Sequence, residues 1–320
     1  MAGFCGYGKM GLGAPRSSAV PVSKSASWCV TEKVHGANFS VHVDRAGRLR
    51  CAKRTGFLAE HEDFFGHFAV LRRRRAGLVA LAEELMAADA AVESAVLVIF
   101  GELFGGRYPH ATVAPDDSAR PVQTGIWYCP HVEFILFDAA VVGGGEGGLF
   151  ESYSRVAGLA EKHGLLYAKP LLVGPRGLCA NYGPRFATTL PAAFGLPVIE
   201  ANTAEGIVVK PWDVQTPICE RPIFKLKVKE FSEGDGCPPP AGDPAMRDFI
   251  LSFVNDNRVA AAASKVGSPS DRDLWNEIVE LVIADIVDEI GEDDQEFLRL
   301  RDQVQCEVMD LLAASAARFA

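Results

Sequence analysis

The sequence lacks the features that place a protein in a membrane or an oxidising compartment. No apolar run approaches the roughly 18 residues that a membrane-spanning helix needs, so no membrane partner is expected. The N-terminus lacks the basic and apolar segments of a secretory signal. No two of the eight cysteines show the two-residue spacing of zinc and dithiol motifs. We therefore expect a cytoplasmic protein with reduced thiols. Residues 1–31 contain no Asp or Glu, which is also compatible with organellar import.

Acidic residues are unevenly distributed along the chain. The 320 residues carry 41 Asp and Glu against 32 Lys and Arg, a formal net charge of −9. Residues 246–320 contain 16 of the acidic and 7 of the basic side chains, which leaves 25 of each in residues 1–245. Because this larger part is neutral overall, a local basic surface for nucleic acid is compatible with the acidic total.

Short apolar runs and period-2 alternation predict strands over much of the first 230 residues. Apolar and polar side chains alternate over 39–44 within residues 27–57, and the segment 44–47 is a turn signal, so this region is typical of paired strands. Further strands are expected at 95–100, 132–137, 206–210 and 223–228.

One long helix is expected among these strands, at residues 67–93. The four arginines 72–75 would point all round it, so we interpret them as solvated, with RNA contact as the alternative. The glycine-rich stretch 141–149 lacks the Lys-Ser/Thr pair of a phosphate loop and is interpreted as a flexible loop.

The character of the chain changes after residue 232. Residues 233–245 are rich in Pro, Gly and Asp and have no periodicity, which predicts a linker. The remainder, 246–320, has a helical pattern. We expect one of its helices to begin with Ser268 as N-cap and Pro269 at N1.

A helical wheel of residues 274–290 places two carboxylates, Asp285 and Glu289, inside the apolar arc. Carboxylates on a buried face are costly unless a cation pairs with them. Arg258 in the preceding helix is the best candidate for that cation. Both a structural ion-pair cluster and a direct functional role are open for these residues.

Lys33 is the first residue with an unusual setting. It lies at the edge of a predicted strand, and Gly36 follows three residues later, so that a phosphate could approach the amine without side-chain bulk. A lysine becomes a nucleophile when its pKa is depressed by burial or by neighbouring cations. Taken alone, the motif is equally compatible with a surface lysine in a hairpin.

The order of the motifs along the chain resembles the covalent nucleotidyltransferases, in particular the phage-type RNA ligase 2 and kinetoplastid RNA-editing ligase family. The match runs nearly end to end, although residues 1–26 and 141–200 match weakly. The matching segments are EKVHGANFS at 32–40, CAKRTG at 51–56, EDFFG at 62–66, FGE at 100–102, FD at 137–138, EGIVVKP at 205–211, KLK at 225–227 and FSE at 231–233.

The resemblance implies an α+β fold. It consists of a nucleotidyltransferase (ATP-grasp-like ligase) domain of antiparallel sheets with flanking helices, at 1–232, and a small all-helical C-terminal domain at 246–320. It also implies an ATP-dependent RNA ligase that uses Mg²⁺ or Mn²⁺. The ligase would join RNA ends bearing a 3′-hydroxyl and a 5′-phosphate, with nicked duplex as the expected substrate.

The same resemblance implies the residue roles. Lys33 would be the nucleophile that carries AMP, with Lys225 and Lys227 as catalytic cations. Glu205 would hold the divalent metal. Phe137 would stack on adenine and Glu102 would bind the ribose. Further nucleotide contacts are implied for Glu32, His35, Asn38, Arg54 and Lys210. In the C-terminal domain, Arg258, Asp285 and Glu289 match a helical domain that the family requires for efficient sealing, and they are implied to contact the RNA end or to orient the domain.

Two other functional classes are less compatible with the sequence. A DNA ligase or an mRNA-capping guanylyltransferase would follow its last lysine motif with an OB-fold barrel, whereas about 75 residues of helical pattern follow here. A catalytically silent RNA-binding subunit is disfavoured by the intact lysine and carboxylate motifs. We expect Lys33, Arg54, Glu102, Phe137, Glu205, Lys225 and Lys227 to line one pocket.

Overall fold

The computed structural model describes residues 3–8, 10–12, 23, 25–87, 94–143, 148–231, 245–290 and 295–319. The chain divides into two compact units, Met1–Val228 and Lys229–Ala320. Within the described ranges, no helix is long and apolar enough to cross a membrane. The expected linker lies outside the described residues except for Ala245, where a helix begins.

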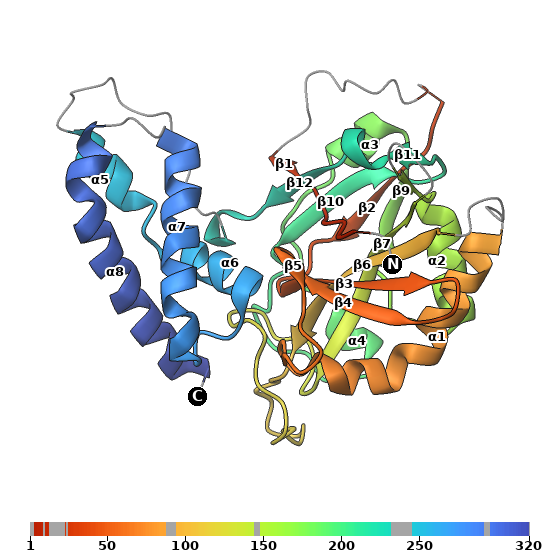
Figure 1. The fold of residues 1–320 in the computed structure, drawn as a ribbon, viewed down its shortest axis with the longest axis horizontal. Coiled ribbons are helices and arrows are strands. Elements are labelled where there is room, and N and C mark those ends of the chain that lie inside the picture. The colour runs from red at the N-terminus through yellow and green to blue at the C-terminus, as the bar shows by residue number, and fades with distance from the viewer. Residues whose placement is uncertain are drawn as a thin grey trace. The chain divides into compact units, whose positions relative to one another are not determined.

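Two sheets form the first unit (Figure 1). The five-stranded sheet has the order β1-β12-β10-β2-β9, with bounds Gly11–Leu12, Phe224–Lys227, Gly206–Pro211, Trp28–Glu32 and Pro170–Gly174. The seven-stranded sheet has the order β11-β8-β7-β6-β3-β4-β5, with bounds Thr216–Pro217, Leu149–Phe150, Val132–Val142, Val96–Gly105, Ala37–Asp44, Leu49–Lys53 and Gly56–Phe57. All strand pairs are antiparallel except β1 with β12. The strands predicted at 95–100, 132–137, 206–210 and 223–228 are therefore confirmed.

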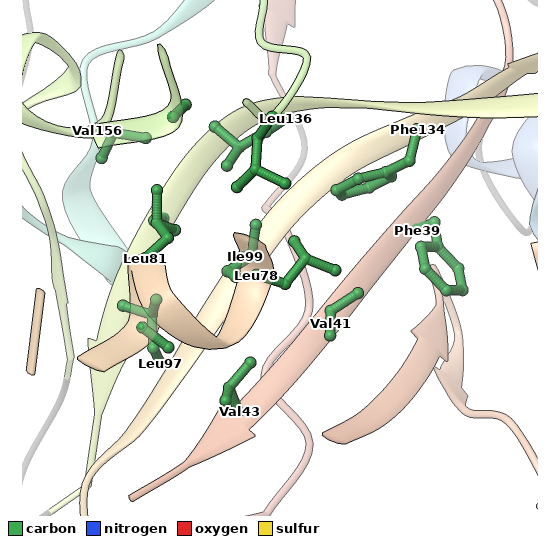
Figure 2. Packing of buried hydrophobic residues seen from close by; sticks show 14 of the residues in the cluster. Phe39, Val41, Val43, Leu78, Leu81, Leu97, Ile99, Phe134, Leu136 and Val156 are labelled. Atoms are coloured by element: carbon green, nitrogen blue, oxygen red, sulfur yellow. The ribbon is translucent and has the colours of Figure 1, made fainter. Parts of the chain in front are cut away.

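The main core lies between the seven-stranded sheet and helix α1, His67–Ala87. Alternate residues of β3, such as Phe39, Val41 and Val43, face this helix, and Leu78 and Leu81 of α1 pack against them (Figure 2). Helix α2, Tyr153–Lys162, also packs on β7. Helix α3, Arg176–Ala180, covers β2 and β9 of the other sheet, and the short helix α4 spans Leu190–Ala193.

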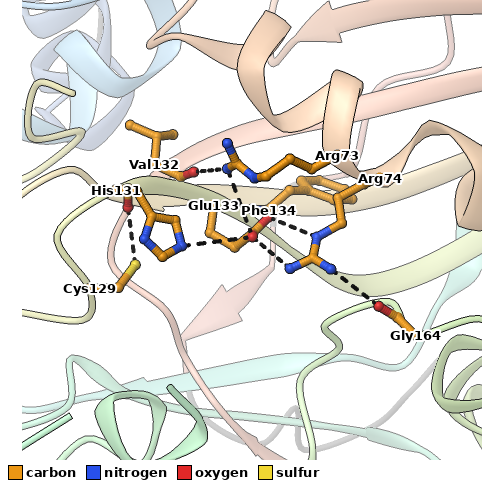
Figure 3. A network of polar contacts seen from close by, with 8 residues as sticks. All are labelled: Arg73, Arg74, Cys129, His131, Val132, Glu133, Phe134 and Gly164. Carbon is orange, nitrogen blue, oxygen red and sulfur yellow. Dashed lines mark hydrogen bonds and ion pairs between the residues drawn. The ribbon is translucent and has the colours of Figure 1, made fainter. Parts of the chain in front are cut away.

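The prediction that the four arginines of α1 are solvated is wrong for Arg74, which pairs with a buried carboxylate, whereas Arg73 keeps 41% of its side-chain surface exposed. Arg74 donates two hydrogen bonds to the carboxylate of Glu133, which is only 1% exposed, and a third to the carbonyl of Gly164. Arg73 donates to the carbonyl of Val132 (Figure 3). A charge-assisted, two-pronged pair of this kind is stronger than a neutral hydrogen bond. These arginines therefore fasten α1 to the beginning of β7.

The second unit is helical in its described residues, with α5 at Ala245–Ser252, α6 at Asp256–Val266, α7 at Trp275–Ile290 and α8 at Gln295–Phe319. Its core is a separate apolar cluster. The predicted helix start at Ser268 is wrong. Asp271 instead caps a short 3₁₀ turn at Arg272–Leu274, and α7 begins only at Trp275. The indole N–H of Trp275 donates to the carbonyl of Pro269, which keeps that segment in a turn before the helix.

Candidate active site

Lys33 lies in the short loop that joins β2 of one sheet to β3 of the other. Its backbone N–H donates to the carbonyl of Gly206 at 2.9 Å, which extends the pairing of β2 with β10. The backbone N–H of His35 donates to the hydroxyl of Tyr128 at 2.9 Å. The loop is therefore fixed on both sides of the Lys33 side chain, which is 17% exposed.

Packing of the backbone gives Gly36 a role in addition to the one expected from the sequence. A Cβ atom at this position would lie 2.1 Å from the carbonyl oxygen of Leu103 and 2.8 Å from Cγ of Glu102. Glycine is therefore required at this position because the loop packs directly against β6. This requirement does not depend on whether a phosphate binds near Lys33. This close approach brings the lysine loop and Glu102 into the same site.

Glu205 is the centre of the charges around this loop. Its carboxylate is 3% exposed and lies 2.6 Å from Nζ of Lys33, 3.1 Å from Nζ of Lys227 and 3.6 Å from Nδ1 of His35. Burial alone would raise the pKa of Glu205, but these basic groups outweigh it and hold the pKa well below its ordinary value. The carboxylate is therefore ionised at neutral pH and keeps the Lys33 amine in one place.

The strand register explains why these cations gather there. Lys227 lies opposite Gly206 in the β10·β12 pair. Lys225 is two residues away and therefore lies on the same face of β12. Phe224 lies on the other face, where it is fully buried between the sheet and α3. Gly206 has φ +153°, and an added Cβ would lie 2.0 Å from the carbonyl of Leu226. Glycine therefore permits the close pairing that presents Glu205 and Lys227 side by side.

Glu102 on β6 is the second carboxylate of the site. Burial, together with the nearby charge of Glu205, raises the pKa of Glu102 to about 8. Three cations act in the opposite direction and lie close enough to affect it: Lys33, Arg54 and Lys227. A carboxylate in this setting gains from hydrogen-bond donors such as sugar hydroxyls.

Asn38 and Arg54 lie near Glu102, and Phe137 lies on β7, beside Tyr7. Asn38 is directly opposite Glu102 in the β3·β6 register. Arg54 follows β4 in the turn before β5 and is partly buried. Phe137 is a partly buried residue of β7, and its ring lies 5.0 Å from that of Tyr7. Phe137 is therefore neither sealed in the main core nor fully exposed.

Glu32, at the end of β2, binds the segment that contains Thr188 and Thr189. Its carboxylate accepts hydrogen bonds from the hydroxyl of Thr188 and from the hydroxyl and backbone N–H of Thr189, at 2.5 to 2.8 Å. Burial raises the pKa of Glu32, although these three donors oppose the shift. The placement does not support a direct nucleotide contact by Glu32, because its oxygens already have partners within the protein.

Lys210, on β10, is also buried and has its partners within the protein. Its ammonium is 1% exposed, donates to the carbonyl of Phe137, and lies 3.5 Å from Asp138 and 3.3 Å from the ring centre of Tyr153. The expected contact with the nucleotide is therefore not supported. Burial lowers the pKa of Lys210 to about 8, with Asp138 opposing the shift.

Sequence reasoning missed the group that surrounds Asp138. This fully buried carboxylate accepts hydrogen bonds from Tyr7 at 2.7 Å and from Arg221 at 2.6 Å, in addition to its contact with Lys210. Asp138 was visible only as the neighbour of Phe137. Neither Tyr7 nor Arg221 carried any signal of its own, because their partners are distant in sequence.

The C-terminal residues belong to the second unit and are described there alone. Asp285 forms an ion pair with Lys265 of α6, at 2.5 Å, so a cation pairs with this carboxylate as expected, while a pairing with Arg258 stays a prediction. The Asp285 side chain is 19% exposed, less buried than the wheel suggested. Arg258 is 2% exposed, with its guanidinium 4.8 Å from the ring centre of Phe253. The side chain of Glu289 lies outside the described residues.

Comparison with known families assigns both units. The RNA ligase family matches residues 26–227, and the C-terminal domain family of T4 RNA ligase 2 matches residues 243–318. Because the first match alone covers more than half of the chain, the protein belongs to the RNA ligase family.

Two curated relatives are ligases of Trypanosoma brucei brucei. RNA-editing ligase 2, mitochondrial, is 32% identical over 207 residues, covering 57% of this chain and 48% of that protein. RNA-editing ligase 1, mitochondrial, is 30% identical over 302 residues, covering 75% of this chain and 64% of that protein. The chain thus spans less than two thirds of the length of either relative.

Solved structures give more distant likenesses. An RNA ligase of Naegleria gruberi has 14% identity and a TM-score of 0.41, over 65% of this chain and 51% of that one. An archaeal ATP-dependent RNA ligase has 16% identity and a TM-score of 0.41, over 97% of this chain and 64% of that one.

Proposed function

We propose that this protein is an ATP-dependent RNA ligase that joins a 3′-hydroxyl to a 5′-phosphate through a lysyl-AMP intermediate. One observation carries the proposal: the Lys33 amine, Lys227 and His35 surround a single ionised carboxylate, Glu205, beside Glu102. A held amine, phosphate-binding cations and carboxylates are what transfer of a nucleotidyl group requires. Membership of the RNA ligase family supports the same chemistry.

In the first step, the lone pair of Lys33 Nζ attacks the α-phosphorus of ATP. A phosphorus–nitrogen bond forms, the bond to the β-phosphate oxygen breaks, and pyrophosphate leaves. The amine must lose a proton and leave its ion pair with Glu205 to do so. Lys225, Lys227 and Arg54 would stabilise the charge that develops on the phosphate oxygens. Phe137 would stack on adenine, and Glu102 would form hydrogen bonds with the ribose hydroxyls.

In the second step, an oxygen of the RNA 5′-phosphate attacks the phosphorus of lysyl-AMP and regenerates the amine. In the third step, the 3′-hydroxyl oxygen attacks the 5′-phosphorus of the adenylylated end. A phosphodiester bond forms and AMP leaves. Neither later step consumes ATP, so the three steps can be measured separately.

The residues present fit a divalent cation held jointly with the substrate. Glu205 is ionised, and the described residues contain no cluster of three or more His, Cys, Asp or Glu side chains that could form a cage for a metal. Mg²⁺ characteristically binds through one or two carboxylates plus substrate phosphates and water. When bound beside Glu205, Mg²⁺ or Mn²⁺ would neutralise phosphate charge; which of the two serves is a matter for titration.

The alternative functions receive less support. A DNA ligase or capping guanylyltransferase was expected to carry an OB-fold barrel after its lysine motif, whereas the described part of 245–319 consists of helices and turns. That segment matches the C-terminal domain of T4 RNA ligase 2. A silent RNA-binding subunit would not need Lys33, Glu205 and Lys227 in mutual contact.

The proposal is tested by incubating the protein with α-labelled ATP or GTP and Mg²⁺, followed by a denaturing gel. We expect label from ATP on the protein. Lys33→Arg keeps the positive charge but removes the nucleophile, because guanidinium stays protonated. It should therefore take no label from ATP and retain sealing of pre-adenylylated RNA. Persistent labelling of this variant would remove Lys33 from the proposal.

The substrate and the cellular setting are tested separately. We propose nicked duplex RNA as the preferred substrate, and the sealing rate on a nicked duplex should exceed that on single strands of the same sequence. The cytoplasmic location also remains a prediction. The two trypanosome relatives are named as mitochondrial proteins, so fractionation of the tagged protein would distinguish the two locations.

A further inference from the structure

The first described residues of the chain contact both sheets of the first unit. The described residues 3–8 and 10–12, here called the N-terminal strap, begin with Phe4. Its ring lies 5.5 Å from Phe57 and 6.2 Å from His42. At the other end, Gly11 and Leu12 pair with Phe224 and Lys225 in the parallel β1·β12 ladder. The strap therefore runs from the seven-stranded sheet to the strand that carries the catalytic lysines.

Tyr7 is the most deeply buried residue of the strap, with 7% of its surface exposed. Its ring makes edge contacts with Phe100, Phe137 and Phe150, at centroid distances of 5.2, 5.0 and 5.7 Å. Its hydroxyl donates to Asp138 at 2.7 Å. Burial, followed by the charge of Asp138, raises the pKa of Tyr7 well above its ordinary value, so the hydroxyl remains a donor.

Phe137 is consequently held from two directions. The Tyr7 ring meets it at 72°, and the Lys210 ammonium binds its backbone carbonyl. Both supports are tied to the same carboxylate, Asp138, which Arg221 also binds. Phe137 keeps some exposed surface, whereas Tyr7, Lys210 and Asp138 are buried. These buried contacts can therefore fix the orientation of Phe137 and leave part of this residue accessible to a ligand.

We infer that Tyr7 is a positioning residue of the nucleotide pocket, which orients Phe137 for adenine and couples docking of the N-terminal strap to ATP binding. The inference rests on the proposed function, because it takes Phe137 as the adenine platform. It assigns a role to a segment that had no recognisable motif in the sequence. The role is distinct from that of a residue touching the reacting atoms.

Coupling of this kind acts in both directions. If the docked strap improves binding of ATP, then bound ATP must stabilise the docked strap by the same factor. The inference therefore makes two independent predictions, one on nucleotide binding in strap variants and one on the strap in the unaltered protein.

The first test uses Tyr7→Leu, which keeps an apolar side chain in place but removes the aromatic edge and the hydroxyl. An edge-to-face aromatic pair is worth enough to change binding by about three- to tenfold. We expect the ATP concentration for half-maximal protein labelling to rise by that factor, with little change in the maximal rate. Tyr7→Phe keeps the ring and should give a smaller rise.

Phe68→Leu is the control outside the strap. Phe68 is 40% exposed on α1, where its ring lies 4.1 Å from that of His67. It should leave the half-saturating ATP concentration unchanged. A lower maximal rate for Tyr7→Leu at an unchanged half-saturating concentration indicates a purely structural role and overturns the inference.

The second test needs no substitution. Hydrogen exchange of the full chain is measured with and without an ATP analogue that has a non-cleavable α,β linkage. We expect slower exchange in a peptide covering residues 3–11 when the analogue binds, and unchanged exchange there would overturn the coupling. Absence of label from ATP on the unaltered protein would instead overturn the proposed function itself, so the two failures are distinguishable.

Discussion

Glu205 and Asp138 are both buried carboxylates with several basic partners, yet the two surroundings differ in access. Glu205 is 3% exposed, but its partners Lys33 and Lys227 keep 17% and 12% of their side-chain surface. Asp138 is 0% exposed, and its partners Lys210 and Arg221 keep only 1% and 5%. The first group can exchange a partner for a substrate phosphate, whereas the second cannot.

This difference in exposure predicts different effects of substitution at Glu205 and at Asp138. Removing one member of a sealed ion cluster leaves a buried charge without compensation, which is strongly destabilising. Removing one member of a partly open cluster costs less, because water and ions reach the remaining groups. We therefore expect substitutions at Glu205 to affect reaction rate more than stability, and substitutions at Asp138 to do the reverse.

Glu205→Gln should produce the largest change. The neutral amide keeps the shape but no longer balances Lys33 and Lys227, so the amine is no longer held for attack. We expect the initial rate of protein labelling at saturating ATP to fall by about 10²- to 10³-fold, while thermal unfolding shifts little. Glu84→Gln, which alters an exposed carboxylate paired with Lys162, is the control and should label normally. A normal rate for Glu205→Gln would break the comparison.

Asp138→Asn should lower the free energy of unfolding by about 3 to 5 kcal/mol, because two buried cations lose their counter-charge. Urea unfolding followed by circular dichroism measures this change. Adding Lys210→Met to Asp138→Asn removes one of the unpaired cations and should recover part of the loss. Additive losses in the double variant would show that Lys210 and Asp138 are not coupled.

The raised pKa of Glu102 predicts that the stability of the protein depends on pH. Its pKa is raised to about 8 in the folded protein, from an ordinary value of 4.5. Between these values the folded state binds more protons than the unfolded one, so stability falls as pH rises, by at most about 1.4 kcal/mol per pH unit. Glu102→Gln lacks this titration. Its stability relative to the unaltered protein should therefore increase from pH 5 to pH 8, and a constant difference would contradict the shift.

The smallest effect is expected in the C-terminal unit. Asp285 and Lys265 keep 19% and 20% of their side-chain surface, so Asp285→Asn should cost only about 0.5 to 1 kcal/mol of stability. Lys265→Met and the double variant complete a thermodynamic cycle. If the ion pair is purely structural, the folded variant seals RNA normally. Poor sealing by a stably folded Asp285→Asn would instead assign the pair to RNA or to orientation of the unit.

Much of the fold and part of the site were predictable because they depend on local patterns. Alternation along 39–44 marked β3, and the order of the motifs gave Lys33, Glu102 and Glu205 before any geometry was known. Interpretations that depended on a distant partner were less successful. Arg74 was assigned to solvent because its partner Glu133 is 59 residues away in the sequence. The burial of Lys210 beside Asp138 could not be seen in the sequence either, and its contact with the nucleotide stays a prediction.

The sequence by itself determined the strand pattern and the change of character after residue 232, because each of these depends on residues close together in the chain. The residues proposed for nucleotidyl transfer came from the resemblance of ordered motifs to a known family. Only the tertiary structure decided which charges are sealed and which remain accessible. Tyr7 and Asp138 are 131 residues apart, and Arg221 and Asp138 are 83 apart. Burial and pairing are properties of the packed sheets, because the free energy of a charge depends on everything that surrounds it.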